Sequence, residues 1–178
     1  SLFERAAEAL DRARSGDAFG PTPGAEPEPE PTALAAIALD DEPARRWLVG
    51  AQRGDGSFGL TAGPVENDSA TGLAVYVLPP GPERESALDH ILSTPARKVP
   101  SDPVAPHDPS LAGWGWSTGT FGWVEPTARA LLALRLLRPQ ATGAIEDAVA
   151  FLADRESVDG GWNYGNRFVY DVALPPFG

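Results

Sequence analysis

The sequence contains no cysteine, and this absence excludes several chemistries at once. Disulfides, thiolate zinc sites and cysteine nucleophiles all require the missing thiol. The two histidines, His90 and His107, lie far apart in the pattern, and we expect both to be solvated surface side chains. The sequence therefore predicts no metal site, and nothing in it indicates a cofactor.

Long apolar runs and basic clusters are also missing. No run approaches the ~20 apolar residues that a membrane span needs. Acidic residues outnumber basic ones by 25 to 14, giving a formal net charge of −11, whereas proteins that track phosphates carry a basic footprint. The sequence predicts a cytoplasmic protein with no nucleic-acid partner and no membrane span. Its basic residues are nearly all arginine, with Lys98 as the one lysine, a composition typical of a GC-rich bacterial genome.

What the chain does contain is helical periodicity interrupted by glycine and proline, which number 19 each. Amphipathic patterns of period 3.6 cover residues 2–15, 43–52, 82–93 and 144–157. Between them lie helical segments that are apolar nearly all round, at residues 32–39, 70–77 and 126–137. Loops are expected at 16–31, which is rich in Pro and Glu, at 95–124, which is rich in Trp, and at 159–178. We therefore predict a single all-α domain over residues 1–178, in which outer and inner helices alternate.

Two sequence patterns recur within the chain. Glu-Pro-Thr-Ala at residues 30–33 returns at residues 125–128, each time before an apolar helical run. An aromatic-aliphatic pair followed by a polar residue, a glycine and an aromatic residue also occurs twice. Its later members are Gln52, Gly56 and Phe58 in the first copy and Glu156, Gly160 and Trp162 in the second. Recurring helical hairpins are typical of solenoids and closed toroids.

The second pattern resembles the QW-type repeat of the terpenoid cyclase and protein prenyltransferase superfamily. WLVGAQRGDGSF fits that repeat at each defining position, and FLADRESVDGGW departs from it only at Glu156, where Gln is usual. The resemblance implies an α/α toroid, with concentric inner and outer helices and a central ligand cavity. The chain supplies roughly half of a six-hairpin barrel and looks incomplete at its C-terminus. A homodimer or a second fragment would then complete the ring.

The repeat residues themselves are better explained by packing than by chemistry. A Gln side chain can bond backbone groups left open at a helix end, and an aromatic ring can cover the adjoining glycine turn. We expect this structural role for Gln52, Gly56, Phe58, Glu156, Gly160 and Trp162.

Catalytic candidates come from the resemblance. Cyclases of the protonating type carry an Asp-x-Asp-Asp-Thr-Ala motif before an inner helix, and the matching segment here is residues 65–70. One register places Asn67 at the proton donor and another places Asp68 there, with Glu66 adjacent. Asn cannot donate a proton as an acid, and the zinc triad of prenyltransferases needs a Cys. Whether the chain is an enzyme stays open at this point.

Aromatic residues gather in the loops next to the inner helices. They can stabilise a carbocation, stack on a sugar or close the barrel end. The candidates for substrate binding are Trp114, Trp116, Phe121, Trp123, Trp162 and Tyr164. The leading hypothesis is a protein that binds or transforms an isoprenoid in a central cavity. The alternatives are a non-catalytic toroid that binds a partner protein, and a six-hairpin carbohydrate enzyme with two carboxylates about 5–10 Å apart.

Overall fold

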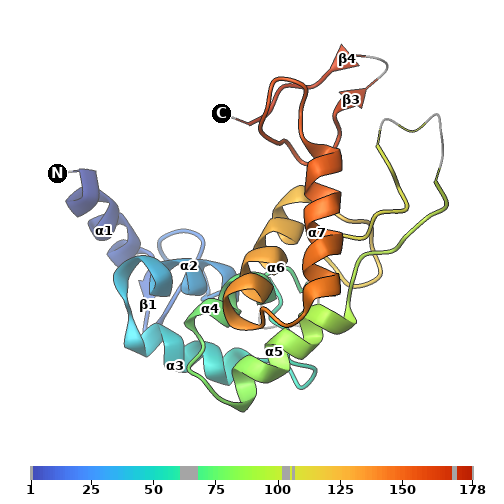
Figure 1. Ribbon diagram of the computed structural model, residues 1–178. Coiled ribbons are helices and arrows are strands. Elements are labelled where there is room, and N and C mark those ends of the chain that lie inside the picture. Colours follow the sequence, from blue (N-terminus) through green and yellow to red (C-terminus); the bar gives the residue numbers. More distant parts are fainter. Residues whose placement is uncertain (1, 61–67, 102–104, 106, 170–171, 178) are drawn as a thin grey trace. The chain divides into compact units, whose positions relative to one another are not determined.

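A computed structural model describes residues 2–60, 68–101, 105, 107–169 and 172–177 (Figure 1). Within those residues the chain is mostly helical, with seven helices and two short β-hairpins, so the predicted all-α class is confirmed. The chain divides into two compact units, Ser1–His90 and Ile91–Gly178. The single domain expected over residues 1–178 stays a prediction, and each unit is described below by itself.

The first unit is built around a nearly all-apolar helix, α2 (Pro29–Leu39). It packs against α3 (Glu42–Ala51) and α4 (Thr71–Val77). The faces in contact bury small residues, among them Ala33, Ala36 and Ala74, which let the helix axes approach closely. The remaining elements are α1 (Leu2–Arg12), β1 (Arg14–Ser15), β2 (Ala18–Phe19) and α5 (Pro82–Ser93), whose last turn contains the boundary between the units.

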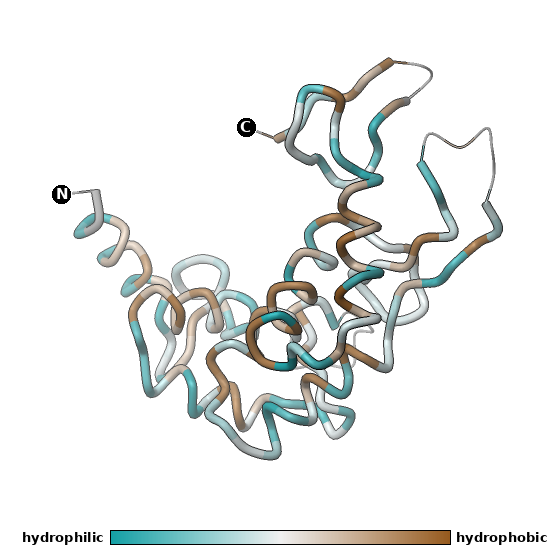
Figure 2. Tube along the Cα trace, viewed as in Figure 1, coloured by the Kyte–Doolittle hydropathy of each residue, from teal (hydrophilic) through white to brown (hydrophobic). Residues whose placement is uncertain are grey.

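The second unit pairs α6 (Val124–Leu137) with α7 (Thr142–Arg155). Leu134 of α6 and Phe151 of α7 are buried. Figure 2 colours the chain trace by the hydropathy of each residue. A hairpin of β3 (Phe168–Val169) and β4 (Val172–Ala173) follows α7. The Trp-rich segment before α6 is irregular, as expected, and contains one isolated β-bridge, between Trp114 and Trp123.

Helix ends elsewhere agree with the sequence prediction to within two residues, and three segments differ more. The first helix ends at Arg12 rather than at residue 15, because Gly16, at φ +62°, and Asp17 form a two-residue turn between β1 and β2. The loop predicted over 16–31 is shorter than expected, because α2 begins at Pro29, where proline suits a first helical turn. The loop expected over 159–178 contains the β3–β4 hairpin, in which Phe168, Val169 and Val172 favour strand.

The two copies of the Gly-aromatic repeat share one backbone geometry. Gln52 and Glu156 are both the C-cap of their helix, at φ −64°, ψ 135° and φ −64°, ψ 132°. In the turn that follows, the Gly56 N–H donates to the Arg53 carbonyl, as the Gly160 N–H does to the Ser157 carbonyl, each over 2.9 Å. The internal repeat inferred from the sequence therefore corresponds to a repeated turn.

A buried threonine ties an aromatic residue to the helix that follows it at three places in the chain. The side chains of Thr32, Thr71 and Thr127 are buried in the first turns of α2, α4 and α6. Their Oγ1 atoms accept hydrogen bonds of 3.0, 2.9 and 2.9 Å from the backbone N–H of the residue thirteen positions earlier. The three donors are Phe19, Phe58 and Trp114. The recurring Glu-Pro-Thr-Ala of the sequence contains Thr32 and Thr127, but it was not linked there to an aromatic residue thirteen positions earlier, so Phe19 was not recognised.

The Gln52 side chain joins the end of α3 to the glycine turn and to α5. Its Nε2 donates to the carbonyls of Gly56 (3.0 Å) and Glu83 (2.8 Å). At the equivalent position Glu156 is exposed and makes no side-chain hydrogen bond within the described part of the chain, since a carboxylate cannot donate to a carbonyl.

We expect Gln52→Ala to lower the free energy of unfolding by about 1–3 kcal/mol, because two part-buried side-chain hydrogen bonds are lost. Urea denaturation would measure the change. Glu156→Ala is the matched control and should shift stability by no more than about 0.5 kcal/mol. Equal losses in the two variants would contradict the role given to Gln52.

Candidate functional site

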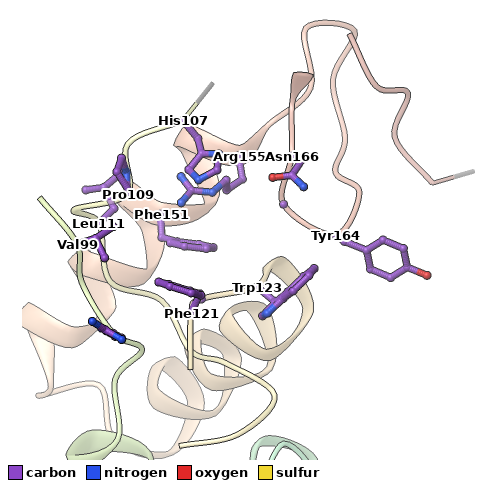
Figure 3. A pocket seen from close by; sticks show the side chains of 13 residues that line it. Val99, His107, Pro109, Leu111, Phe121, Trp123, Phe151, Arg155, Tyr164 and Asn166 are labelled. Carbon is purple, nitrogen blue, oxygen red and sulfur yellow. The ribbon is translucent and has the colours of Figure 1, made fainter. Parts of the chain in front are cut away.

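A cavity of about 370 Å³ opens within the second unit. We call it the aromatic pocket, and it is lined by Arg97, Val99, His107, Pro109, Leu111, Phe121, Gly122, Trp123, Phe151, Arg155, Tyr164, Gly165 and Asn166 (Figure 3). Its volume lies within the usual range of small-molecule sites, and its wall is largely aromatic and aliphatic. No carboxylate is among the lining residues.

Backbone hydrogen bonds hold the loop that forms one side of the pocket. The Arg97 N–H donates to the Thr120 carbonyl over 2.8 Å, and the Trp123 N–H donates to the Trp114 carbonyl over 2.9 Å. Trp114 is held in turn by Thr127 of α6. The repeat thus fixes the loop that presents Phe121 and Trp123.

Phe151 forms the base of the pocket, and the loop backbone lies directly against its ring. A Cβ added at Gly122 would come within 2.8 Å of the ring, and one at Gly113 within 3.0 Å. Glycine is needed at both positions because nothing larger fits between the loop and α7. This contact explains why Phe151 is only 1% exposed.

One end of the pocket is polar. Arg155 is buried, with its guanidinium 4.3 Å from the centre of the Phe151 ring and in an ion pair with Asp154. Figure 3 shows His107 beside Arg155 next to Phe151. The Nδ1 atom of His107 is buried without a hydrogen-bond partner in the described residues. The backbone N–H of Asp108, the residue after His107, donates to Asp154 over 3.1 Å.

Three of the six aromatic residues predicted to bind substrate line the pocket. These are Phe121, Trp123 and Tyr164, and the rings of the last two meet edge to face at 6.4 Å. The other three lie outside the lining: Trp114 is buried and donates from Nε1 to the Ile91 carbonyl over 2.7 Å. Trp116 lies 5.8 Å from the Arg129 guanidinium, and Trp162 donates from Nε1 to the Leu152 carbonyl.

The sequence did not identify Phe151, Arg155 or His107 as residues of this site. In the sequence Phe151 was marked only as the first residue of the second repeat copy, FLADRESVDGGW. That repeat position was the one sequence signal that pointed to Phe151. His107 lies in an irregular loop and Arg155 at the end of α7. Hydrophobic periodicity does not predict that these two segments meet at one pocket.

The catalytic candidate Asp68 lies in the first unit, close to His90. Their Oδ2 and Nε2 atoms are 2.8 Å apart, and the two side chains are 12% and 8% exposed. The expectation that His90 is a solvated surface residue is wrong, because its ring is enclosed between Asp68 and, at 3.7 Å from Nδ1, Asp55. Burial raises the pKa of Asp55, but hydrogen bonds from Ser57 and the charge of His90 bring it below 3.8.

The Asp68–His90 contact links the segment before α4 with helix α5. A carboxylate beside an imidazole can also transfer a proton. Glu66 and Asn67, the other catalytic candidates, lie outside the described residues. Asp68 does not line the cavity of about 830 Å³ in its own unit, which is formed by α1, α2 and prolines of the loop between them.

Across the described residues, no three His, Asp or Glu side chains are arranged to hold a metal ion. None of the helices described is both long and apolar enough to cross a membrane.

The pH dependence of stability should contain a contribution from His107. Burial, and then the charge of Arg155, lower its pKa below the ordinary 6.5, with Asp154 and Asp108 opposing. The unfolded chain then binds this proton at a higher pH than the folded chain does, so the free energy of unfolding falls as pH drops below about 6.5.

Thermal melts of the wild type and of His107→Asn between pH 8 and 5 would test this. The wild type should lose stability relative to the variant as pH falls. The pKa values of Asp41 and Asp108 are also lowered, but the stabilisation that these carboxylates provide is lost only below about pH 4. They therefore do not affect the comparison between pH 8 and 5. Parallel curves between pH 8 and 5 would contradict the account of His107.

Comparison with protein-family models finds no family that matches the chain, and comparison with curated protein sequences finds no matching protein.

Proposed function

We propose that this chain binds an isoprenoid in the aromatic pocket of its second unit, as a repeat protein of the terpenoid cyclase and prenyltransferase type. The observation that carries the proposal is the convergence of Phe121, Trp123 and Phe151 on one cavity, with Tyr164 at its edge (Figure 3). Branched hydrocarbon chains lack strong polar groups, and they bind where apolar area leaves water. Aliphatic contacts from Val99 and Leu111 complete such a wall.

The repeated turn and the three threonine contacts support the toroid architecture as part of this proposal. Inner helices of an α/α toroid turn one side toward a central cavity. In the first unit α2 exposes Leu34 and Ile37 by 48% and 50%, and in the second α6 exposes Leu132 and Leu136 by 54% and 68%. A ring completed by a second copy or another fragment would cover these side chains. Native mass spectrometry of the purified protein would measure that assembly. We expect the protein to be cytoplasmic.

Transformation of the ligand, rather than binding alone, would require a proton donor. Asp68 and His90 are the pair to examine, and loss of turnover in Asp68→Asn would support a catalytic role. The pair belongs to the first unit and does not line the aromatic pocket, so binding is the function that the pocket supports best.

A partner-protein interaction is the second candidate function. It is favoured by the cavity in the first unit, where Leu10 of α1, Leu34 and the half-exposed Leu60 form an apolar surface. The carbohydrate-enzyme alternative gains no support from the aromatic pocket, because its lining lacks the pair of carboxylates that glycoside hydrolysis requires.

Isothermal titration calorimetry with geraniol tests the proposed function. Trp123→Ala should weaken binding by at least about tenfold, since removing one aromatic wall loses on the order of 1.5–3 kcal/mol of apolar contact. Trp162→Ala is the control, because Trp162 is comparably exposed and lies outside the pocket. No binding by the wild type, or equal weakening by both variants, would contradict the proposal.

A further inference from the structure

Helix α1 of the first unit has an apolar side that the described residues leave uncovered. None of residues 4–12 is buried, although the helix is amphipathic. The cavity of about 830 Å³ lies against this helix, and we call it the α1–α2 groove. Its apolar lining includes Ala6, Ala9, Leu10 and Ala13 of α1, together with Leu34 of α2 and Leu60. An amphipathic helix buries its apolar stripe against another element, so an uncovered stripe indicates a binding surface.

The part of the groove formed by β2 is fixed before any partner binds. Phe19 is 1% exposed, and its backbone N–H and carbonyl are bonded to the Thr32 hydroxyl over 3.0 and 3.1 Å. The Arg14 guanidinium lies 4.4 Å from the centre of the Phe19 ring and is in an ion pair with Asp41. A wall that is ordered in advance lowers the entropic cost of binding.

The groove is open, which favours an extended partner over a small molecule. Leu34 is 48% exposed and Leu60 is 37% exposed, whereas small-molecule sites enclose most of the ligand surface. The 11 residues of α1 make its side of the groove about 16 Å long, or three helical turns. An amphipathic helix of that length can lay its apolar face along the groove. The exposed Ala6 and Ala9 allow such a helix to approach α1 closely.

The charge of the groove indicates the polar residues of the partner. Glu28 and Glu30 are the charged side chains among the described residues that line it, and both are partly buried. Arg14 is in an ion pair, and Arg5 and Arg12 of α1 are not among those lining residues. The first unit as a whole carries 16 acidic against 7 basic residues. This field attracts basic partners, and it repels a second copy of the chain, with its net charge of −11, and an anionic membrane surface.

We propose that the α1–α2 groove binds an amphipathic helix of another protein, which packs its apolar face against Leu10, Leu34 and Leu60 and places lysine or arginine side chains beside Glu28 and Glu30. Such binding does not depend on an isoprenoid in the aromatic pocket, which belongs to the second unit. The groove would then be the surface that the second candidate function requires.

The apolar contact is tested with a fluorescent peptide of leucine and lysine, about 14 residues long, whose leucines share one helical face. Fluorescence anisotropy would measure its dissociation constant. Leu34→Gln should weaken binding about tenfold, because one apolar contact is lost. Leu132→Gln is the matched control, since Leu132 of α6 is 54% exposed and belongs to the second unit, and it should change binding less than about twofold.

A second variant separates binding from folding. Leu10→Gln, on the α1 side of the groove, should weaken binding by a factor similar to that of Leu34→Gln. Thermal melts of both variants are compared with the wild type, and if one of them melts lower, the other carries the test.

The charge preference is tested in the same assay. Glu28→Gln combined with Glu30→Gln should weaken binding about three- to tenfold, because two charge pairs at the groove are lost. The control is Glu83→Gln combined with Glu85→Gln, which removes the same charge from the first turn of α5, outside the groove. It should weaken binding less than about twofold.

No binding of the leucine–lysine peptide, or equal weakening by Leu34→Gln and Leu132→Gln, would overturn the groove as the binding surface. Equal affinity for a peptide with glutamate at every lysine position would overturn the basic partner, and equal affinity for one with leucines all round the helix would overturn apolar packing. A wild-type dimer that Leu34→Gln abolishes would show that a second copy occupies the groove instead. Peptide binding that follows the predicted pattern supports the groove whether or not geraniol binds, so the two proposals fail independently.

Discussion

Gly56→Ala is expected to lower the free energy of unfolding by roughly 3 kcal/mol or more. Gly56 has φ +86°, and a Cβ there would lie far inside van der Waals contact with the backbone carbonyl of Ser86 in α5. Backbone strain and overpacking each contribute about 1–3 kcal/mol, and a carbonyl within a helix cannot move aside as a flexible side chain can. Urea denaturation followed by circular dichroism would measure the loss.

Two other glycines separate the causes. Gly160, the equivalent residue in the second copy, has φ +83° and open space around it, so Gly160→Ala should cost only about 1 kcal/mol for the backbone conformation. Gly54 lies two residues before Gly56 in open space, without a positive φ, and Gly54→Ala should be nearly neutral. If Gly56→Ala behaved like Gly160→Ala, the close approach of the turn to α5 would be refuted.

The second large effect is expected for Phe151→Ala, at about 3–5 kcal/mol. The ring is 1% exposed, supports the loop at Gly113 and Gly122, and lies against Arg155. Its removal leaves a cavity that the glycine backbone cannot fill. The same variant should abolish geraniol binding, because the base of the pocket is lost.

Phe121→Ala is the control within the same pocket. Phe121 is 56% exposed, so its truncation should cost less than about 1 kcal/mol of stability while still weakening geraniol binding. Equal destabilisation by the two variants would show that the packing assigned to Phe151 is wrong.

The sequence predicted much of the helical order, because apolar periodicity and proline positions act locally. Pro82 and the 3.6-residue pattern placed a helix over residues 82–93, and α5 covers the same range. The β1–β2 hairpin was missed because amphipathic periodicity continues through Arg14, whereas a single glycine turn ends the helix. Such a turn depends on one backbone angle, which hydrophobic patterning does not reveal.

The candidate site was predicted in part. Aromatic richness marked Phe121, Trp123 and Tyr164, but it could not separate them from Trp114, whose indole serves the core. His90 appeared to lie on a solvated helix face, and its burial depends on Asp68, a residue 22 positions earlier in the chain. Pairings over that distance arise from packing between elements, which local sequence does not encode.

Photolabelling tests the central claim most directly. A geraniol analogue that carries a diazirine on its hydrocarbon chain would be bound, irradiated and mapped by peptide mass spectrometry, with unmodified geraniol as competitor. The account predicts labels in peptides that contain Phe121, Trp123 or Phe151, and their loss on competition. Labelling confined to the first unit, or labelling that geraniol does not displace, would contradict isoprenoid binding in the aromatic pocket.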